Sequence, residues 1–77
     1  MDPSEISRLQ KYLRDTFKLD AIEIRRRTNK DDSAEVYIGD EFIGVVFRDD
    51  EDGELSYAFQ MAILDIDLPT VAVVSKS

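Results

Sequence analysis

The sequence contains no cysteine and no histidine among its 77 residues. Without cysteine there is neither a disulfide nor a thiolate zinc site, and without histidine the commonest metal ligand and neutral-pH general base are missing. The six serines therefore have no histidine to activate them, and no spacing brings a particular pair of carboxylates together. We therefore expect that the protein is not an enzyme and that it has no catalytic residues, no metal site and no cofactor.

Long apolar runs are also missing. The N-terminal stretch MDPSEISRLQ has no apolar segment of the kind found in signal peptides, and the longest apolar runs elsewhere are too short to span a bilayer. We therefore expect a soluble cytoplasmic protein that does not enter a membrane, and the lack of cysteine fits a reducing compartment.

The charge is unevenly distributed along the chain. Residues 1–30 carry a net charge of +3, whereas residues 31–77 carry −10, and the total is −7. An acidic protein is unsuited to non-specific nucleic-acid binding, although this division permits one basic surface. The alternative function that we keep open is a nucleic-acid-binding adaptor, and its candidate residues are Arg14, Lys18, Arg25 and Arg27.

An amphipathic helix is predicted over about residues 3–17. Asp2 is suited to the N-cap and Pro3 to the first helical position, and Glu5 stands where a capping box places its acid. Apolar residues then recur at helical spacing, at Ile6, Leu9, Leu13 and Phe17.

Alternation of apolar and polar residues predicts four strands after the helix. They are expected over residues 21–28, 34–38, 41–48 and 55 to about 66, the last being the longest. The run 57–68 would also suit a helix, but its alternation favours a strand. The connections are a polar turn over 28–32, a two-residue turn at Gly39-Asp40 and an acidic turn over 49–54.

These elements predict an α+β fold, with the N-terminal helix packed on a four-stranded antiparallel β-meander. Residues 1–68 would form a single domain, and residues 69–77 a C-terminal tail that is β-prone or flexible. Pro69 ends the fourth strand, and Thr70–Val74 is a candidate fifth strand.

The expected registers give the sheet two apolar faces. The turn at Gly39-Asp40 places Val36 opposite Ile43, and the acidic turn places Val45 opposite Gln60. One face would carry Val36, Ile38, Ile43, Val45, Phe47, Ala58, Ala62 and Leu64. The other would carry Tyr37, Phe42, Val46, Tyr57, Phe59, Met61 and Ile63.

One helix covers only one face of such a sheet, so the second face needs another cover. The candidates for this cover are the tail and a second copy of the protein. Alternatively, the strand register is shifted by one residue, in which case these apolar residues do not share one face. We favour a homodimer, and hence a non-enzymatic protein-interaction module, with an unidentified protein partner also open. The hypothetical interface consists of Tyr37, Phe42, Val46, Tyr57, Phe59 and Met61.

The acidic turn also invites a calcium interpretation. If Gly53 is aligned with the glycine of an EF-hand loop, Arg48 falls at the first ligand position and Phe59 at the twelfth. Because neither side chain binds calcium, the turn is interpreted as a solvated acidic hairpin that protects a sheet edge.

The chain resembles a known family in two segments, EISRLQKYLRDTF and DSAEVYIGDEFIGVVFRDDEDGELSYAFQMAILDIDL. Together they cover about residues 3–68 and are similar to short alphaproteobacterial proteins catalogued as domain of unknown function 3126. The resemblance implies a bacterial cytoplasmic protein. It supplies no activity, substrate or functional residue.

Overall fold

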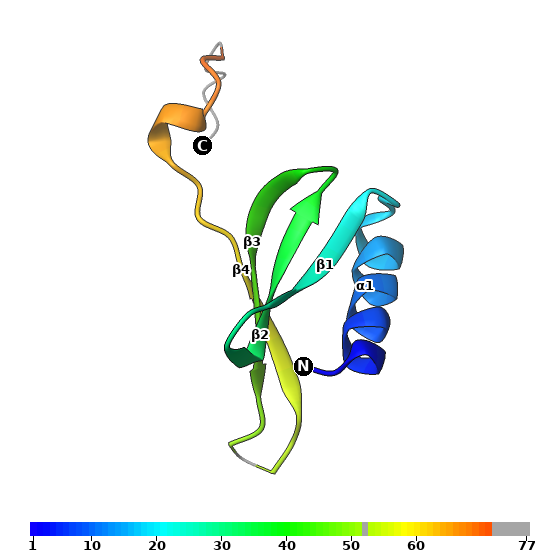
Figure 1. Cartoon of the computed structure of the whole chain (residues 1–77). Coiled ribbons are helices and arrows are strands. Elements are labelled where there is room, and N and C mark those ends of the chain that lie inside the picture. Colours follow the sequence, from blue (N-terminus) through cyan, green and yellow to red (C-terminus); the bar gives the residue numbers. More distant parts are fainter. Residues whose placement is uncertain (52, 72–77) are drawn as a thin grey trace.

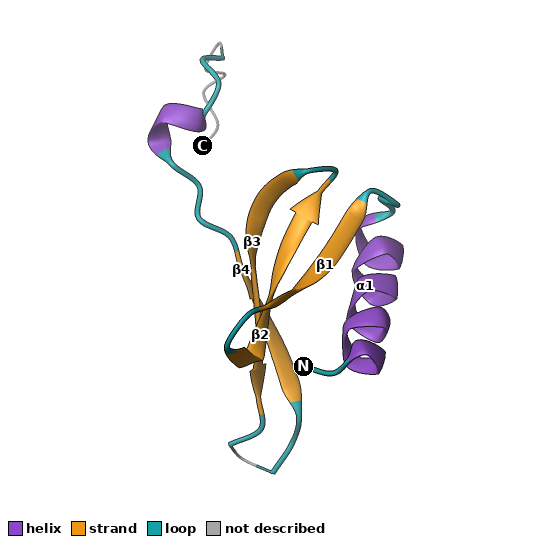
Figure 2. Cartoon of the chain, viewed as in Figure 1, coloured by secondary structure: helices purple, strands orange, loops and turns teal. Residues whose placement is uncertain are grey.

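One helix packs on a single antiparallel sheet in this computed structural model, which describes residues 1–51 and 53–71 (Figures 1 and 2). The elements are α1 (Pro3–Phe17), β1 (Ile22–Arg27), β2 (Lys30–Ile38), β3 (Glu41–Asp49), β4 (Ser56–Gln60) and a short 3₁₀ helix, η1 (Asp65–Asp67). The strands lie in the order β1-β2-β3-β4, with antiparallel neighbours. The α+β meander expected from the sequence is confirmed.

Helix α1 begins and ends with local caps. The Asp2 carboxylate accepts a hydrogen bond from the Glu5 N–H at 2.8 Å, with Pro3 following the cap. At the other end Lys18 adopts a left-handed conformation with φ 54°, and its N–H bonds the Arg14 carbonyl. The capping box expected at Glu5 is only half formed, because the Glu5 carboxylate bonds Arg48 and Tyr57 instead.

The connection between β1 and β2 is tighter than expected. The turn is Thr28-Asn29, and β2 begins at Lys30, within the stretch predicted to be a polar turn. Asn29 has φ 66°, a conformation that asparagine tolerates better than most residues. Thr28 and Asn29 can therefore form a two-residue turn. The polar residues that follow them, from Lys30 onward, belong to β2 and not to the turn.

A β-bulge in β3 corrects the predicted register. The pairs Ile38–Glu41 and Tyr37–Phe42 follow the Gly39-Asp40 turn as expected, but Val36 then pairs with Gly44. Ile43 is the extra residue of the bulge. Because one extra residue reverses the facing of everything beyond it, the two predicted faces are wrong as sets.

Strand β4 is the shortest strand rather than the longest. The predicted pair Val45–Gln60 is confirmed, but β4 ends there and does not continue to Ile66. The bulge increases the local twist of β3 and disrupts the ladder, so the chain leaves the sheet beyond this pair. Of the candidate fifth strand, Thr70 and Val71 are not in a strand, and the remainder lies outside the described residues.

The core lies between α1 and one face of the sheet. Strand pairing places Val36 between Ile24 and Gly44, and Val46 between Ala34 and Phe59, on that face. The buried apolar residues are Met1, Leu13, Ile22, Ile24, Ala34, Val36 and Val46.

The helix lies on the β1 side of this face, as Figure 1 shows. There Gln10 accepts a hydrogen bond from the Ile24 N–H at 2.9 Å, and the Arg14 Nε donates one to the Ile22 carbonyl at 2.7 Å. Helix side chains thus bond the outer backbone edge of β1.

Candidate interaction surfaces

The six residues predicted to form one interface lie in three different places. Their positions follow from the bulge in β3 and the early end of β4. Val46, Tyr57 and Phe59 are on the face that packs against α1, and Val46 is fully buried. Tyr37 and Phe42 lie on the opposite face, and Met61 follows the end of β4. The predicted surface is therefore not a single surface.

The sheet face away from α1 nevertheless carries several apolar residues, and we call this surface the open face. Its members are Tyr37, Phe42, Val45, Phe47 and Ala58. Phe47 pairs with Ala58 across β3 and β4, and Phe42 is 52% exposed. The rings of Tyr37 and Phe42 meet edge to face, with centroids 5.7 Å apart. No helix among the described residues covers this face.

A polar network borders the open face on the β1 side. The Tyr37 hydroxyl donates a hydrogen bond to Glu35 at 2.9 Å, which raises the pKa of Tyr37 above 10.0. The Arg25 guanidinium lies over the Tyr37 ring, 3.8 Å from its centroid, and binds Glu23 and Asp40. The hydrogen bond to Glu23 raises the pKa of Arg25. Apart from Tyr37 in β2, the apolar residues of the open face therefore lie on β3 and β4.

A second apolar surface is a groove of about 640 Å³ between α1 and β4, which we call the α1–β4 groove. It exists because the helix sits over the other half of the sheet. Its lining residues are Glu5, Arg8, Leu9, Tyr12, Leu13, Val46, Leu55, Tyr57 and Phe59. Tyr12 is 65% exposed and Leu55 is 56% exposed, so both are accessible from solvent.

The N-terminal end of this groove is held by an ion pair and a hydrogen bond. The Glu5 carboxylate accepts bonds from the Tyr57 hydroxyl and from Arg48, whose Nη1 is 3.3 Å from each oxygen. These bonds lower the pKa of Glu5 below 4.5, although burial opposes the change. The hydrogen bond between the Tyr57 hydroxyl and Glu5 raises the pKa of Tyr57 above 10.0. Glu5 is therefore engaged in fixing α1 to β3 and β4.

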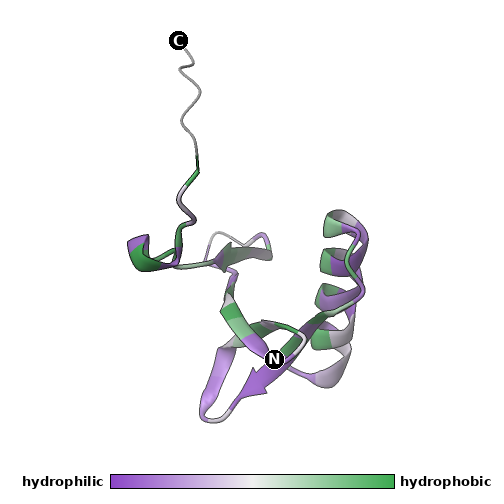
Figure 3. Ribbon diagram, turned by 90° about the horizontal axis from the view of Figure 1, so that it is seen from above, coloured by the Kyte–Doolittle hydropathy of each residue, from purple (hydrophilic) through white to green (hydrophobic). Residues whose placement is uncertain are grey.

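The chain beyond β4, residues 61–71, is a third apolar surface, which we call the C-terminal arm. Its large apolar side chains are 53–87% exposed. They are Met61, Ile63, Leu64, Ile66, Leu68 and Val71. Figures 1 and 3 show the arm leaving the sheet on the side away from α1, and Figure 3 shows its apolar residues in green.

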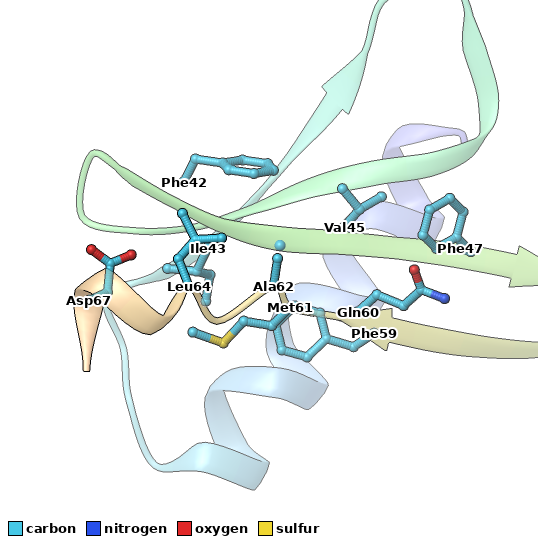
Figure 4. A pocket seen from close by; sticks show the side chains of 11 residues that line it. Phe42, Ile43, Val45, Phe47, Phe59, Gln60, Met61, Ala62, Leu64 and Asp67 are labelled. Atoms are coloured by element: carbon cyan, nitrogen blue, oxygen red, sulfur yellow. The ribbon is translucent and has the colours of Figure 1, made fainter.

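The root of the arm and β3 border a hollow of about 860 Å³ on the open face. Figure 4 shows Leu64 beside Ile43, with Phe42 and Asp67 nearby. The hollow is wide open, and its lining is largely apolar, with Gln60 and Asp67 as its polar side chains. It contains no set of groups suited to acid–base or nucleophilic chemistry.

The cations proposed for nucleic acid are not gathered on one surface. Arg14 lies between α1 and β1, whereas Arg25 and Arg27 belong to the other side of the sheet. Three of the four already have partners within the chain, since Arg27 donates a hydrogen bond to the buried Ser33 at 3.1 Å. Lys18 is the exposed cap of α1.

The described residues hold no group of three or more acidic side chains placed to bind a metal ion. Asp52, which belonged to the calcium interpretation, lies outside the described residues. None of the helices in residues 1–51 and 53–71 is long and apolar enough to cross a bilayer.

A family model described as "Protein of unknown function (DUF3126)" matches residues 5–67, which is most of the chain. No curated protein and no solved structure is similar enough to add to this. The match covers α1 from Glu5 onward, the whole sheet and η1, and it agrees with the resemblance of the two sequence segments. The chain therefore belongs to the DUF3126 family of proteins of unknown function.

Proposed function

We propose that this protein is a non-enzymatic interaction module that forms a homodimer along the β4 side of its sheet, through the open face. The observation that carries the proposal is the asymmetry of the sheet. The β1 edge is bonded by helix side chains, whereas β4 is an edge strand with an exposed apolar face beside it. Unpaired edges and apolar patches are the features through which small domains associate.

The size of the core supports association with a second copy. Seven apolar residues are buried, whereas eleven large apolar residues are exposed among those described. Chains of this length commonly add a disulfide, a metal or a partner subunit to offset their ordering entropy, and this one has no cysteine. In a symmetric dimer, a second copy of the chain would bury part of this exposed apolar surface. Both subunits would use the same surface, because a two-fold interface is self-complementary.

The proposal includes a cytoplasmic location and no chemical reaction. The absence of cysteine supports a reducing compartment. The absence of histidine supports a binding role over catalysis. The largely apolar linings of the α1–β4 groove and of the hollow at the root of the arm support the same role. The nucleic-acid alternative stays a prediction without an observation in its favour, because most of its cations are engaged elsewhere.

The experiment that tests this function compares two open-face variants with a matched control. Phe42→Asp and Ala58→Asp each place a charge on an exposed position of the open face. Thr28→Asp adds the same charge in the exposed β1–β2 turn. All three should remain folded by circular dichroism, because none of the positions is in the core.

Light scattering on a sizing column should then show monomers for both open-face variants and a dimer for Thr28→Asp. A buried unpaired charge at an interface commonly costs about 2 kcal/mol or more, which is about 30-fold in dissociation constant. If the folded open-face variants keep the mass of the unmodified dimer, the open face is not the interface.

A further inference from the structure

The apolar side chains of the C-terminal arm are largely left uncovered by the described residues of their own subunit. Six large apolar side chains in residues 61–71 are more than half exposed, and Ile66 is 87% exposed. The arm leaves the sheet on the side away from α1 (Figures 1 and 3). An apolar segment of this kind is a hazard for aggregation unless another surface receives it.

The α1–β4 groove is an apolar surface that the described residues leave open to solvent. No residue of the arm lines it, and its floor includes Leu9, Leu13 and Val46. Arg8 stands at its rim and has no ion pair among the described residues, whereas Glu5 is occupied by Arg48 and Tyr57. The groove therefore presents apolar surface with one available positive charge.

We propose that the C-terminal arm of one subunit occupies the α1–β4 groove of a second copy, and that the two arms are exchanged reciprocally. This inference rests on the proposed self-association and names the contact that completes it. The arm combines Leu64, Ile66 and Leu68 with two acids, Asp65 and Asp67. Apolar side chains would enter the groove while an acid meets Arg8, so the two surfaces are complementary in both polarity and charge.

The length of the arm suits this contact. Eleven residues reach about 35 Å when extended, and the fifteen residues of α1 span about 22 Å. The arm is therefore long enough to follow the groove after crossing to a neighbouring subunit. An exchange of identical segments closes on itself with two-fold symmetry and so gives a dimer and not a fibre.

The area involved also suits a stable dimer. The exposed parts of the six arm side chains amount to roughly 400 Å² of apolar surface. Two arms and the two grooves that they cover would bury about 1,200 Å², which is the lower end of the range for specific interfaces.

The test uses one arm variant and one groove variant, each at an exposed position. Ile66→Asp damages the arm, and Tyr12→Asp damages the groove. Each should raise the dimer dissociation constant by about 30-fold or more. Leu68→Asp and Leu55→Asp are the second pair, used if either first variant loses its circular-dichroism spectrum, and Thr28→Asp is the control that should keep the original affinity.

Mixing the arm variant with the groove variant decides between exchange and a contact within one chain. The mixed dimer retains one intact arm–groove contact, because the undamaged arm of the Tyr12→Asp chain meets the undamaged groove of the Ile66→Asp chain. Native mass spectrometry should therefore show the mixed dimer above either homodimer. If mixing restores nothing, the arm binds its own subunit and the exchange is overturned.

The failure of this inference differs from the failure of the proposed function. If the unmodified chain is dimeric and Phe42→Asp separates it, while the arm and groove variants leave the dissociation constant unchanged, the exchange is refuted and self-association stands. The same result would be expected if a small apolar molecule were the occupant of the groove. If the unmodified chain is monomeric, both proposals are overturned.

Discussion

Gln10 of the helix accepts a hydrogen bond from the backbone N–H of Ile24 at 2.9 Å, and this contact closes one edge of the sheet. Arg14 bonds the Ile22 carbonyl one turn further along the helix. The sheet thus has one edge bonded to its own helix and one edge, β4, without a partner strand among the described residues. The proposed dimer follows from this difference.

Gln10→Ala should destabilise the fold by about 1–2 kcal/mol, because the partly buried Ile24 N–H would lose its acceptor. Urea unfolding followed by circular dichroism measures the change. The neighbouring variant Lys11→Ala removes only an exposed ion pair with Asp15 and should cost no more than about 0.5 kcal/mol. If the two variants lose the same free energy of unfolding, the hydrogen bond between Gln10 and Ile24 does not stabilise the fold more than an exposed ion pair does.

Glu5 should make the stability depend on pH in the acid range. Its pKa is lowered in the folded state by Tyr57 and Arg48, so its contribution is present above pH 4.5 and is lost as the pH falls through the folded pKa. Glu5→Gln should therefore be less stable than the unmodified chain near neutral pH, by about 1 kcal/mol. Unfolding in urea at about pH 7 and pH 3 measures both chains. The difference between them should shrink at the lower pH, and a constant difference would contradict the assigned role.

Tyr57 should make the stability fall as the pH rises in the alkaline range, which is opposite to the effect of Glu5. Its pKa is raised by the bond to Glu5, so its contribution is present below pH 10.0 and is lost as the pH rises through the folded pKa. Tyr57→Phe should remove this alkaline part of the pH dependence, and the ultraviolet absorbance of tyrosinate follows the titration directly. Tyr12→Phe, whose tyrosine has no hydrogen bond among the described contacts, is the matched control.

Gly44→Ala should destabilise the sheet by about 1–3 kcal/mol. A Cβ at this position would lie 2.4 Å from the Gln60 carbonyl oxygen and 2.7 Å from the Phe59 ring, so the end of β4 would have to move. Thermal unfolding measures the loss. Gly39→Asn is the control, because nothing lies near a Cβ there and asparagine tolerates its φ of 62°. Similar losses at the two glycines would show that the close approach at Gly44 is unimportant.

The helix and the Gly39-Asp40 turn could be predicted from the sequence because their causes are local, whereas the turn after β1 is shorter than predicted. Asp2, Pro3 and the apolar spacing defined α1, and the turn at Gly39-Asp40 fixed the start of the β2–β3 register. The pair Val45–Gln60 was also predicted from the position of the acidic turn.

The faces of the sheet could not be obtained in the same way, because one bulged residue reverses them. A signal was present: an isolated glycine within a strand, here Gly44, often marks a bulge or a close backbone approach. The contacts of Gln10 and Glu5 had no signal, since they depend on where the helix lies across the sheet. For the same reason, the division of the apolar residues between the open face and the α1–β4 groove required the structure.

The most direct test of self-association is the solution mass of the unmodified chain, measured by light scattering on a sizing column across a dilution series. Self-association predicts a mass of about twice 8.8 kDa at high concentration, falling toward 8.8 kDa as the dimer dissociates on dilution. A mass of 8.8 kDa at every concentration would contradict the proposed dimer and the exchange of arms that rests on it.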